Sequence, residues 1–263
     1  MEAYDIVKNS RNADRWCASD YIKLLITDFL ELHGDRKYGD DKAVIAGIGK
    51  LLDRPITVIG IEKGNDIVSR LEHNFGSAHP EGYRKAMRLM KEAEKFGRPV
   101  LCLIDTAGAY AGVDAEERGQ GQAIAESLML MSSLRTPVIS IIIGEGGSGG
   151  ALALAVSDRL YMLDDAYFSV VSPENCATIL WKSNKYADKA ADALKLTAVD
   201  LKEREIIDDV FKTASSAWDE KTINIYKEKL LTKLDKEYES LAKMPALDLV
   251  DMRYKKYRRI GRV

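Results

Sequence analysis

The stretch that organises this fold reads Pro137-Val138-Ile139-Ser140-Ile141-Ile142-Ile143-Gly144-Glu145-Gly146-Gly147-Ser148-Gly149-Gly150-Ala151. Its nearly unbroken apolar run, between a proline and a glycine, predicts a strand that is buried on both faces. The Ala/Leu run at 151–156 predicts a short helix that packs tightly against this strand. Glycines between the two allow a sharp turn or a close approach of the backbone to a ligand. Because the first N–H groups of a helix have no acceptor within it, we expect this turn to bind an anion.

One known motif that matches this loop is the dinucleotide-binding fingerprint, Gly144-x-Gly146-x-x-Gly149. The acidic residue that follows such a fingerprint is supplied by Asp164 or Asp165, about 20 residues later. Two observations weaken this interpretation. A loop so rich in glycine produces spaced patterns easily, and the helix that follows is short for a crossover in a parallel sheet.

Two further motifs are excluded by their own requirements. Gly146-x-Ser148-x-Gly150 matches the nucleophile elbow of α/β-hydrolases, which needs a histidine later in the chain than the serine. All three histidines precede Ser148: His33, His73 and His79. A phosphate-binding P-loop would end in Lys-Ser/Thr, where this chain has Ala-Leu at 151–152. With these motifs excluded, the groups of this loop that can bind a ligand are its backbone amides. The alternative is that the loop is a tight turn that binds no ligand.

Composition and charge narrow the classes of protein to consider. The chain has 263 residues and a net charge of −2, which argues against nucleic acid as the main partner. No signal peptide is visible, and no apolar run approaches the ~18 residues of a membrane span. Cys17, Cys102 and Cys176 form no C-x-x-C pair, so we expect buried small hydrophobes and no metal site in this chain. These features predict a cytoplasmic protein.

The first half of the chain alternates helical and extended patterns. Apolar spacing predicts a helix from Ser19 to Leu32, with His33 in its last turn. Runs at 43–48 and 56–61 predict an antiparallel hairpin, and the polar stretch 63–78 predicts a loop. Pro80 to Phe96 is the clearest helix. Its basic residues are expected on a solvated face, with contact to a phosphate or an acidic partner as the alternative: Arg84, Lys85, Arg88, Lys91 and Lys95.

A second strand–turn–helix unit precedes the glycine loop. Residues 100–104 predict a buried strand, 105–112 a turn of small residues, and Glu116 to Leu134 a helix. Backbone amides from two such turns, near Gly108 and Gly149, can hold a single oxygen if the turns face each other. This arrangement would be an oxyanion hole.

The remaining elements are shorter, apart from one long helix. Strands are predicted at 159–163 and 167–171, and a helix begins at Pro173 with Ser172 as its cap. Helices are also predicted at 188–196, 198–204 and 219–241. The basic tail from Arg253 to Arg262 is expected to be a solvated end, with an interface or a phosphate contact as the alternative.

Six segments, in order between about Tyr21 and Asp209, resemble the carboxyltransferase α subunit of bacterial acetyl-CoA carboxylase. They are Glu31-Leu32-His33-Gly34-Asp35-Arg36, Asn74-Phe75-Gly76, His79-Pro80-Glu81-Gly82-Tyr83-Arg84-Lys85-Ala86, Ala115-Glu116-Glu117-Arg118-Gly119-Gln120, the Gly144–Ala151 loop and Ile179-Leu180-Trp181-Lys182. No single segment is diagnostic, but several long ones in the same order are highly specific.

This resemblance implies an α/β fold of the crotonase-like type, a right-handed coil of ββα units with flanking helices. It implies one carboxyltransferase domain over residues 1–263. Within it we expect a helical N-terminal segment at about 1–34, a ββα core at about 42–211 and a helical C-terminal segment at about 219–260.

The resemblance also implies the reaction and the partners. Carboxybiotin on the biotin carboxyl carrier protein gives its carboxyl group to acetyl-CoA, and the product is malonyl-CoA for fatty acid biosynthesis. In this family the α subunit pairs with a β subunit that bears a four-cysteine zinc ribbon, in an α2β2 assembly, and biotin carboxylase completes the larger ATP-dependent complex. No nucleic acid or membrane is implied as a main partner.

Site residues carry over position by position. The resemblance implies an oxyanion hole made by the backbone amides of Gly108, Ala109, Gly149 and Gly150. It implies a biotin-side pocket at Gly146, Gly147, Ser148 and Tyr110. Roles in ordering the structure near the site are implied for Asp105, Glu116, Glu117 and Arg118.

The chain departs from the family pattern at three places. Ala107 and Ala111 replace two prolines, which should make that turn less rigid, and Asn175 replaces a common glycine. No backbone donor is lost, so we expect activity to be retained. The alternatives are a carboxyltransferase for a different acyl-CoA, a nucleotide-binding oxidoreductase and a non-catalytic scaffold.

Overall fold

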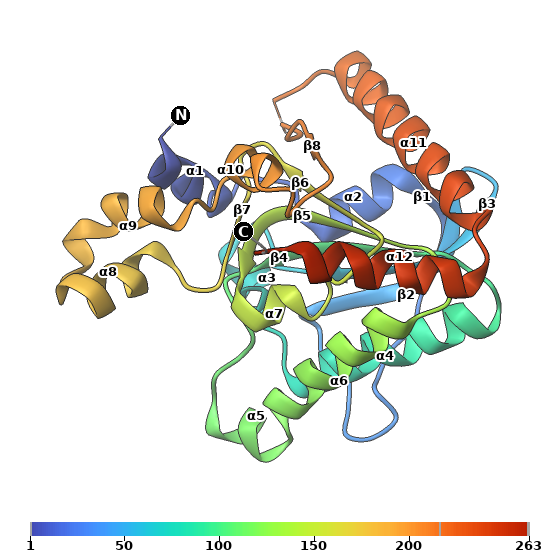
Figure 1. Cartoon of the computed structure of the whole chain (residues 1–263), viewed down its shortest axis with the longest axis horizontal. Helices are drawn as coiled ribbons and strands as arrows, with labels where there is room; N and C mark the ends of the chain where they lie inside the picture. The colour runs from blue at the N-terminus through green and yellow to red at the C-terminus, as the bar shows by residue number, and fades with distance from the viewer. Residues whose placement is uncertain (1, 216, 262–263) are drawn as a thin grey trace.

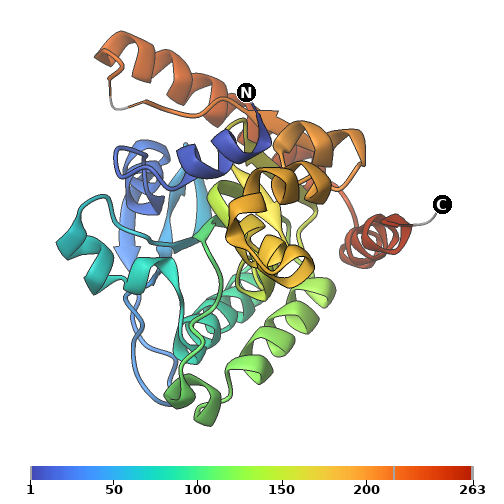
Figure 2. The same cartoon turned by 90° about the vertical axis from the view of Figure 1, so that its left-hand side faces the viewer.

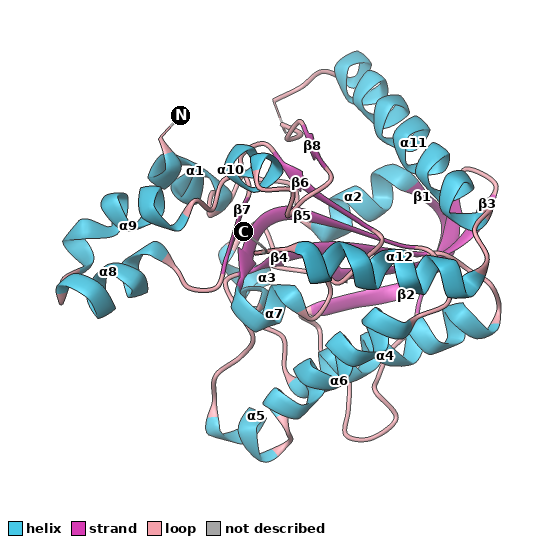
Figure 3. Cartoon of the chain, viewed as in Figure 1, coloured by secondary structure: helices cyan, strands magenta, loops and turns pink. Residues whose placement is uncertain are grey.

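One eight-stranded sheet runs through the middle of the computed structural model, which describes residues 2–215 and 217–261 (Figure 3). The strands are β1 (Ile26–Glu31), β2 (Val44–Leu51), β3 (Arg54–Ile61), β4 (Val100–Thr106), β5 (Val138–Gly147), β6 (Arg159–Leu163), β7 (Tyr167–Ser169) and β8 (Asp209–Phe211). Their order is β1-β2-β3-β4-β5-β6-β8, and β7 pairs with the carboxyl end of β5. The pairs β1–β2 and β2–β3 are antiparallel, and the others are parallel.

Helices cover both faces of the sheet. They are α1 (Ala3–Ser10), α2 (Ala18–Leu25), α3 (Ile67–Glu72), α4 (Pro80–Lys95), α5 (Val113–Glu117), α6 (Gln120–Ser133), α7 (Ser148–Leu152), α8 (Pro173–Trp181), α9 (Ala187–Leu194), α10 (Ala198–Glu203), α11 (Glu220–Ala242) and α12 (Ala246–Arg259), with 3₁₀ turns η1 (Asn74–Gly76) and η2 (Asn184–Tyr186). In Figures 1 and 2, α4 and α6 lie side by side on one side of the sheet, and α2 and α11 lie on the other.

Several expectations are confirmed by the structure. β2 and β3 form the predicted antiparallel hairpin, in register from Val44↔Ile61 to Leu51↔Arg54. Helix α4 begins at Pro80, and the Ser172 side chain caps α8 by accepting from the Asn175 amide. Strands β4 and β5 are fully buried, as their continuous apolar runs predict. All three cysteines are buried and free.

The predicted helix from Ser19 to Leu32 is wrong in its second half. Helix α2 ends at Leu25, and β1 continues as an edge strand paired with β2. A Cβ at Gly47 of β2 would fall within 3.0 Å of the Leu30 carbonyl oxygen. The glycines of β2 thus let β1 approach closely, and this tertiary contact overrides the helical spacing. His33 therefore follows a strand, with Nδ1 3.0 Å from Asp40 Oδ2, and does not lie in a helix turn.

Other element boundaries also differ from the predictions. The 63–78 segment contains α3 and η1, and β8 was not predicted. β5 runs through the glycines to Gly147, so α7 is only five residues long. The helix expected from Glu116 to Leu134 is divided at Gly119, whose φ of +82° ends α5 and precedes α6.

Cationic residues expected in solvent, Lys85 and Arg253 among them, are buried instead. Lys85 is 0% exposed, and its Nζ lies 2.6 Å from Asp40 Oδ1 and 2.8 Å from the Asp41 carbonyl oxygen. Arg253 is also 0% exposed and forms an ion pair with Asp158 at 2.7 Å. The basic tail is therefore anchored to the core by α12, which corrects the expectation of a solvated end. Arg262 of that tail, and Met1 of the expected N-terminal segment, lie outside the described residues.

Candidate active site

The two strand–turn–helix units meet at the carboxyl ends of β4 and β5 (Figure 1). The strands pair in parallel as far as Thr106↔Gly146, so the turn after β4 lies against the start of α7. A Cβ at Gly147 would fall within 3.0 Å of the Ala107 carbonyl oxygen, and a Cβ at Gly150 within 3.0 Å of the Ala109 nitrogen. Only glycine at these two positions permits the observed contact between the turns.

The backbone amides of the two turns differ in their hydrogen bonds. Gly108 N donates to Thr106 Oγ1 at 3.0 Å, and that hydroxyl donates to the Gly108 carbonyl oxygen at 2.9 Å. Within the described part of the chain, the Ala109 N–H has no acceptor. Gly149 and Gly150 lie in the first turn of α7, where N–H groups have no acceptor within the helix. Ala109, Gly149 and Gly150 thus offer their amides to a ligand, whereas the amide of Gly108 fixes the turn.

An apolar pocket of about 250 Å³ opens at Gly149, one of these three residues. Its lining comes from α7, β7 and α10 with the residues that follow them, and includes Ser148, Gly149, Leu152 and Phe168. Of the predicted pocket residues only Ser148 lies here, next to Gly149, which was predicted as an amide of the oxyanion hole. Gly146 and Gly147 are buried in β5 and do not line this pocket.

Tyr110 and Ser148 occupy distinct surroundings. The Tyr110 ring packs against His79, with ring centroids 4.3 Å apart, and does not line the apolar pocket. Ser148 is exposed and has a φ of +51°, in the left-handed region. Such a conformation is unfavourable for a residue with a Cβ and occurs here where the strand turns sharply into α7.

Asp105 lies buried at the end of β4, directly before the first turn. Its Oδ1 accepts from the Glu145 amide at 2.8 Å and lies 3.6 Å from Lys63 Nζ. A Cβ at Gly144 would clash with this carboxyl group. Burial raises the pKa of Asp105 above its ordinary value. Asp105 therefore ties the ends of β4 and β5 together.

Glu145 joins several elements behind the glycine turn. It forms ion pairs with Lys63 and with Arg11 Nε, the latter at 2.8 Å, and accepts from the Tyr167 hydroxyl at 2.9 Å. Burial by itself raises the pKa of Glu145, but the positive charges of Lys63 and Arg11 outweigh it and the net pKa is lowered. Arg11 also contacts Glu174, so this network connects the N-terminal helix and α8 to β5.

The three charged residues of the α5 region have different surroundings. Arg118 forms ion pairs with Glu81 and Asp114, each at 3.1 Å, and so orders the turn between α5 and α6. Glu116 and Glu117 are exposed and make no ion pair with any described residue. Their side chains are free for an external contact.

Three further side chains lie near the two turns but were not assigned to the site by the sequence analysis. Lys63 was placed in a polar loop, yet it is buried between Asp105 and Glu145. Gln120 donates to the carbonyl oxygens of Ala78 and Tyr110 and so clamps the first turn. The buried hydroxyl of Tyr83, in α4, has no described partner and lies where a Cβ of Gly150 would approach it.

The dinucleotide fingerprint loses support because its first two glycines, Gly144 and Gly146, lie in β5 rather than in a turn. The helix that should receive the pyrophosphate is α7, which is only five residues long. Across the described residues, no cluster of three or more His, Cys, Asp or Glu side chains is arranged to hold a metal ion. None of the helices in these residues is long and apolar enough to cross a membrane.

Comparison with solved structures supports the predicted fold class. The chain superposes on transcarboxylase 12S with a TM-score of 0.70 and 18% identity, over 89% of its own length and 44% of that protein's chain. It superposes on a chain of a Pseudomonas malonate decarboxylase hetero-tetramer with a TM-score of 0.64 and 17% identity, covering 84% and 90% of the two chains. The expected crotonase-like α/β fold is confirmed by these neighbours.

Sequence comparison gives closer relatives. Residues 1–261 match the family described as acetyl co-enzyme A carboxylase carboxyltransferase-like. The acetyl-coenzyme A carboxylase carboxyl transferase subunit alpha of Ruminiclostridium cellulolyticum is 55% identical, over 100% of this chain and 99% of that protein. The subunit alpha of Bacillus subtilis is 50% identical, over 100% of this chain and 81% of that protein. The resemblance stated from the six segments is therefore confirmed, and the chain belongs to the family of acetyl-CoA carboxylase carboxyltransferase α subunits.

Proposed function

We propose that this chain provides the biotin-side half of a carboxyltransferase that moves a carboxyl group from carboxybiotin, on a separate carrier protein, to acetyl-CoA. The observation that carries the proposal is the unpaired Ala109 amide in contact with Gly150, beside the first amides of α7, where Gly149 lines an apolar pocket. Fixed N–H groups next to an apolar cavity are suited to an oxygen that gains negative charge during a reaction.

The backbone amides perform the main chemical task in this proposal. Carboxybiotin supplies the carboxyl group, and release of that group leaves negative charge on the ureido oxygen. Ala109, Gly149 and Gly150 donate to this oxygen without reorganising, which stabilises the transition state by about 3 kcal/mol per donor. Confinement of CO2 next to the acyl-CoA raises the rate further. The proton of the acetyl methyl group passes to the biotin nitrogen that has lost its carboxyl group, so no side chain of this protein has to act as a base.

The proposed partners are those that the family resemblance implies. The proposed acyl-CoA side of the site belongs to a β subunit with a zinc ribbon, in an α2β2 assembly, and the carrier protein and biotin carboxylase complete the complex. Ser148 and Val170 at the pocket are exposed, the latter by 77%. Glu116 and Glu117 are also free for an external contact.

Co-expression with the β subunit tests this function. The purified pair should decarboxylate malonyl-CoA in the presence of biocytin, and neither subunit alone should do so. Methylmalonyl-CoA in a parallel assay tests a different acyl-CoA substrate, and calorimetry with NAD tests the oxidoreductase alternative. A pair that assembles but transfers no carboxyl group to biocytin from either thioester would contradict the proposal.

A further inference from the structure

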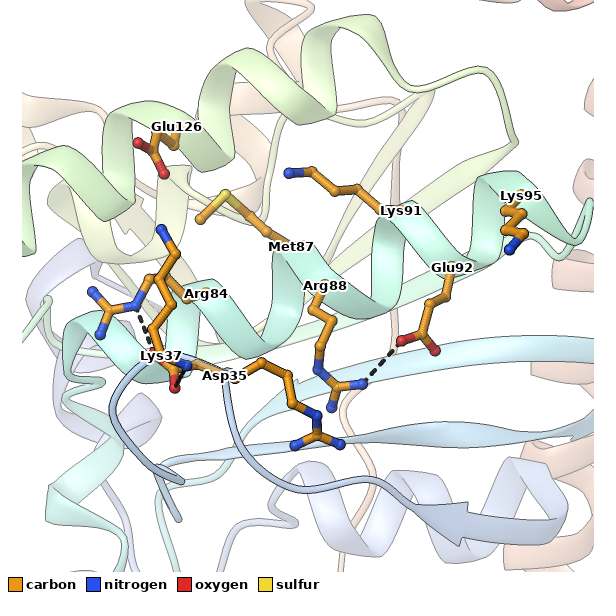
Figure 4. Close-up of a pocket in the computed structure, with 10 residues that line it drawn as sticks. Asp35, Lys37, Arg84, Met87, Arg88, Lys91, Glu92, Lys95 and Glu126 are labelled. Atoms are coloured by element: carbon orange, nitrogen blue, oxygen red, sulfur yellow. Dashed lines mark hydrogen bonds and ion pairs between the residues drawn. The ribbon is translucent and has the colours of Figure 1, made fainter.

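A basic groove lies between α4, α6 and the loop that follows β1 (Figure 4). We define it by its six cationic residues: Arg36, Lys37, Arg84, Arg88, Lys91 and Lys95. Its volume is about 430 Å³, within the range of small-molecule pockets. Three carboxylates also line it, so its net charge is +3, although the whole chain carries −2. Four of the cations recur at positions 84, 88, 91 and 95, which places them along one face of α4.

Two arginines build the wall of the basic groove. Arg84 Nε donates to the buried carboxylate of Asp35 at 2.6 Å, and its Nη1 donates to the Arg118 carbonyl oxygen at 3.0 Å. Arg88 donates to the Gly34 carbonyl oxygen and to Glu92. These bonds fasten the β1–β2 loop to α4. The shape of the groove is therefore set before any ligand arrives, which reduces the entropy lost on binding.

Two lysines of the basic groove, by contrast, have ammonium groups without a described partner. Lys37 and Lys91 are exposed, and among the described residues neither ammonium group has a hydrogen bond or an ion pair. Figure 4 shows the ends of both side chains pointing toward α6, on either side of Met87. The third carboxylate, Glu126, accepts a hydrogen bond from Gln122. An unpaired cluster of like charges around a concave site attracts an anionic ligand.

We propose that the basic groove binds a small ligand that carries a di- or triphosphate group. Lys37 and Lys91 bind the phosphates, and Met87 provides an apolar surface beneath them. A concave pocket with few free charges suits a compact polyphosphate better than an extended acidic protein surface.

This site is distinct from the candidate active site. Ile124 of α6 faces the position of Gly149, with Cγ2 3.5 Å from where a Cβ would lie. Glu126, two residues later, lines the basic groove. Residues two apart on a helix do not share a face, so α6 stands between the groove and the glycine turn. Binding in the groove can therefore be measured without carboxyl transfer.

Titration calorimetry of the full 263-residue chain with tripolyphosphate tests the proposal. The double variant Lys37→Glu/Lys91→Glu reverses the two open charges, and Lys229→Glu on α11 makes the same change at an exposed lysine outside the groove. We expect the double variant to lose affinity by at least about tenfold, and the control to match the wild type. Binding should also weaken as salt is added.

Further titrations identify the type of ligand that carries the phosphates. ATP and CoA are titrated separately, and binding of either that depends on Lys37 and Lys91 supports the site and names the ligand type. Absence of tripolyphosphate binding, or equal affinity in the double variant and the control, would overturn the proposal. It would also be overturned if the double variant lost affinity for the β subunit alone, because the groove would then be a protein interface.

Discussion

Gly150 lies so close to the backbone nitrogen of Ala109 that a Cβ on Gly150 would fall within 3.0 Å of it. These residues belong to turns that are about 40 positions apart in the chain, after two parallel strands. Their contact places an unpaired amide of one turn beside the first amides of α7. The geometry of this site therefore depends on the absence of one side chain.

The variant Gly150→Ala tests that dependence. An added methyl group must push the two turns apart, so we expect carboxyl transfer by the α/β pair to fall about 100-fold or more, the usual cost of losing one such donor. Overpacking should also lower the free energy of unfolding by about 1–3 kcal/mol. The assay is malonyl-CoA decarboxylation with biocytin, together with urea unfolding.

Gly121→Ala in α6 is the matched control, because a Cβ there has no neighbour within 4 Å. It should leave transfer unchanged and stabilise the exposed helix slightly. If Gly150→Ala assembled normally and kept full transfer activity, the contact between the turns would have no part in catalysis.

Elements set by local pattern were predictable from the sequence. Continuous apolar runs identified β4 and β5, and Pro80 marked the start of α4. The strand β1 was missed because its apolar spacing fits a helix, and only the pairing with β2 decides between the two. Lys85 and Arg253 were misplaced for a similar reason, since their carboxylate partners, Asp40 and Asp158, come from distant parts of the chain.

The candidate site was predictable only in outline. Two turns of small residues could be located, but their contact depends on strand order, which the spacing of residues does not determine. The hydrogen bond from Gly108 N to Thr106 Oγ1 could not be predicted from the sequence either. Because of this bond, the Gly108 amide, one of the four predicted oxyanion-hole donors, already has an acceptor within the turn. Tyr83, Lys63 and Gln120 were missed because the groups they contact or approach come from other segments of the chain.

At Ser148, substitution by glycine should be tolerated better than substitution by valine, which is the opposite of the order expected at an ordinary helical serine. Its φ of +51° disfavours a β-branched side chain, whereas glycine adopts it freely. We expect Ser148→Gly to be more stable than Ser148→Val by about 1 kcal/mol or more, measured by urea unfolding.

The same pair of changes at Ser132, an exposed position in α6, gives the control. In a right-handed helix valine is preferred over glycine, so the order of stability should reverse there. If the glycine and valine variants had the same order of stability at both positions, the left-handed conformation at Ser148 would be contradicted.

Arg253 should be essential for the docking of α12. Its guanidinium is fully buried, pairs with Asp158 and donates to the carbonyl oxygens of Met131 and Leu134 at 2.5 and 2.9 Å. Arg253→Met leaves the Asp158 charge buried without its partner, so we expect a loss of about 3–5 kcal/mol in the free energy of unfolding.

The double variant Arg253→Met/Asp158→Asn should recover part of this loss, because no uncompensated charge remains. The Asp158 carboxylate accepts from the Val138 amide at 2.7 Å, and the side-chain oxygen of the introduced asparagine can accept the same hydrogen bond. Losses that simply add in the double variant would show that the two side chains do not interact.

Asp35 should stabilise the fold only above strongly acidic pH. Burial by itself raises the pKa of this carboxyl, but donation from the amides of residues 37–39 and from Arg84 lowers it to about 2, from an ordinary value of 3.8. A folded-state pKa below the unfolded one stabilises the protein above about pH 4, and this stabilisation is lost as the pH falls to about 2. The difference in unfolding free energy between wild type and Asp35→Asn should therefore be largest near neutral pH and shrink toward pH 2.

Asp53→Asn, at an exposed position in the β2–β3 turn, controls for the loss of a negative charge. A difference for Asp35→Asn that stayed constant between about pH 7 and pH 2 would mean that the ionised carboxylate does not hold the loop after β1.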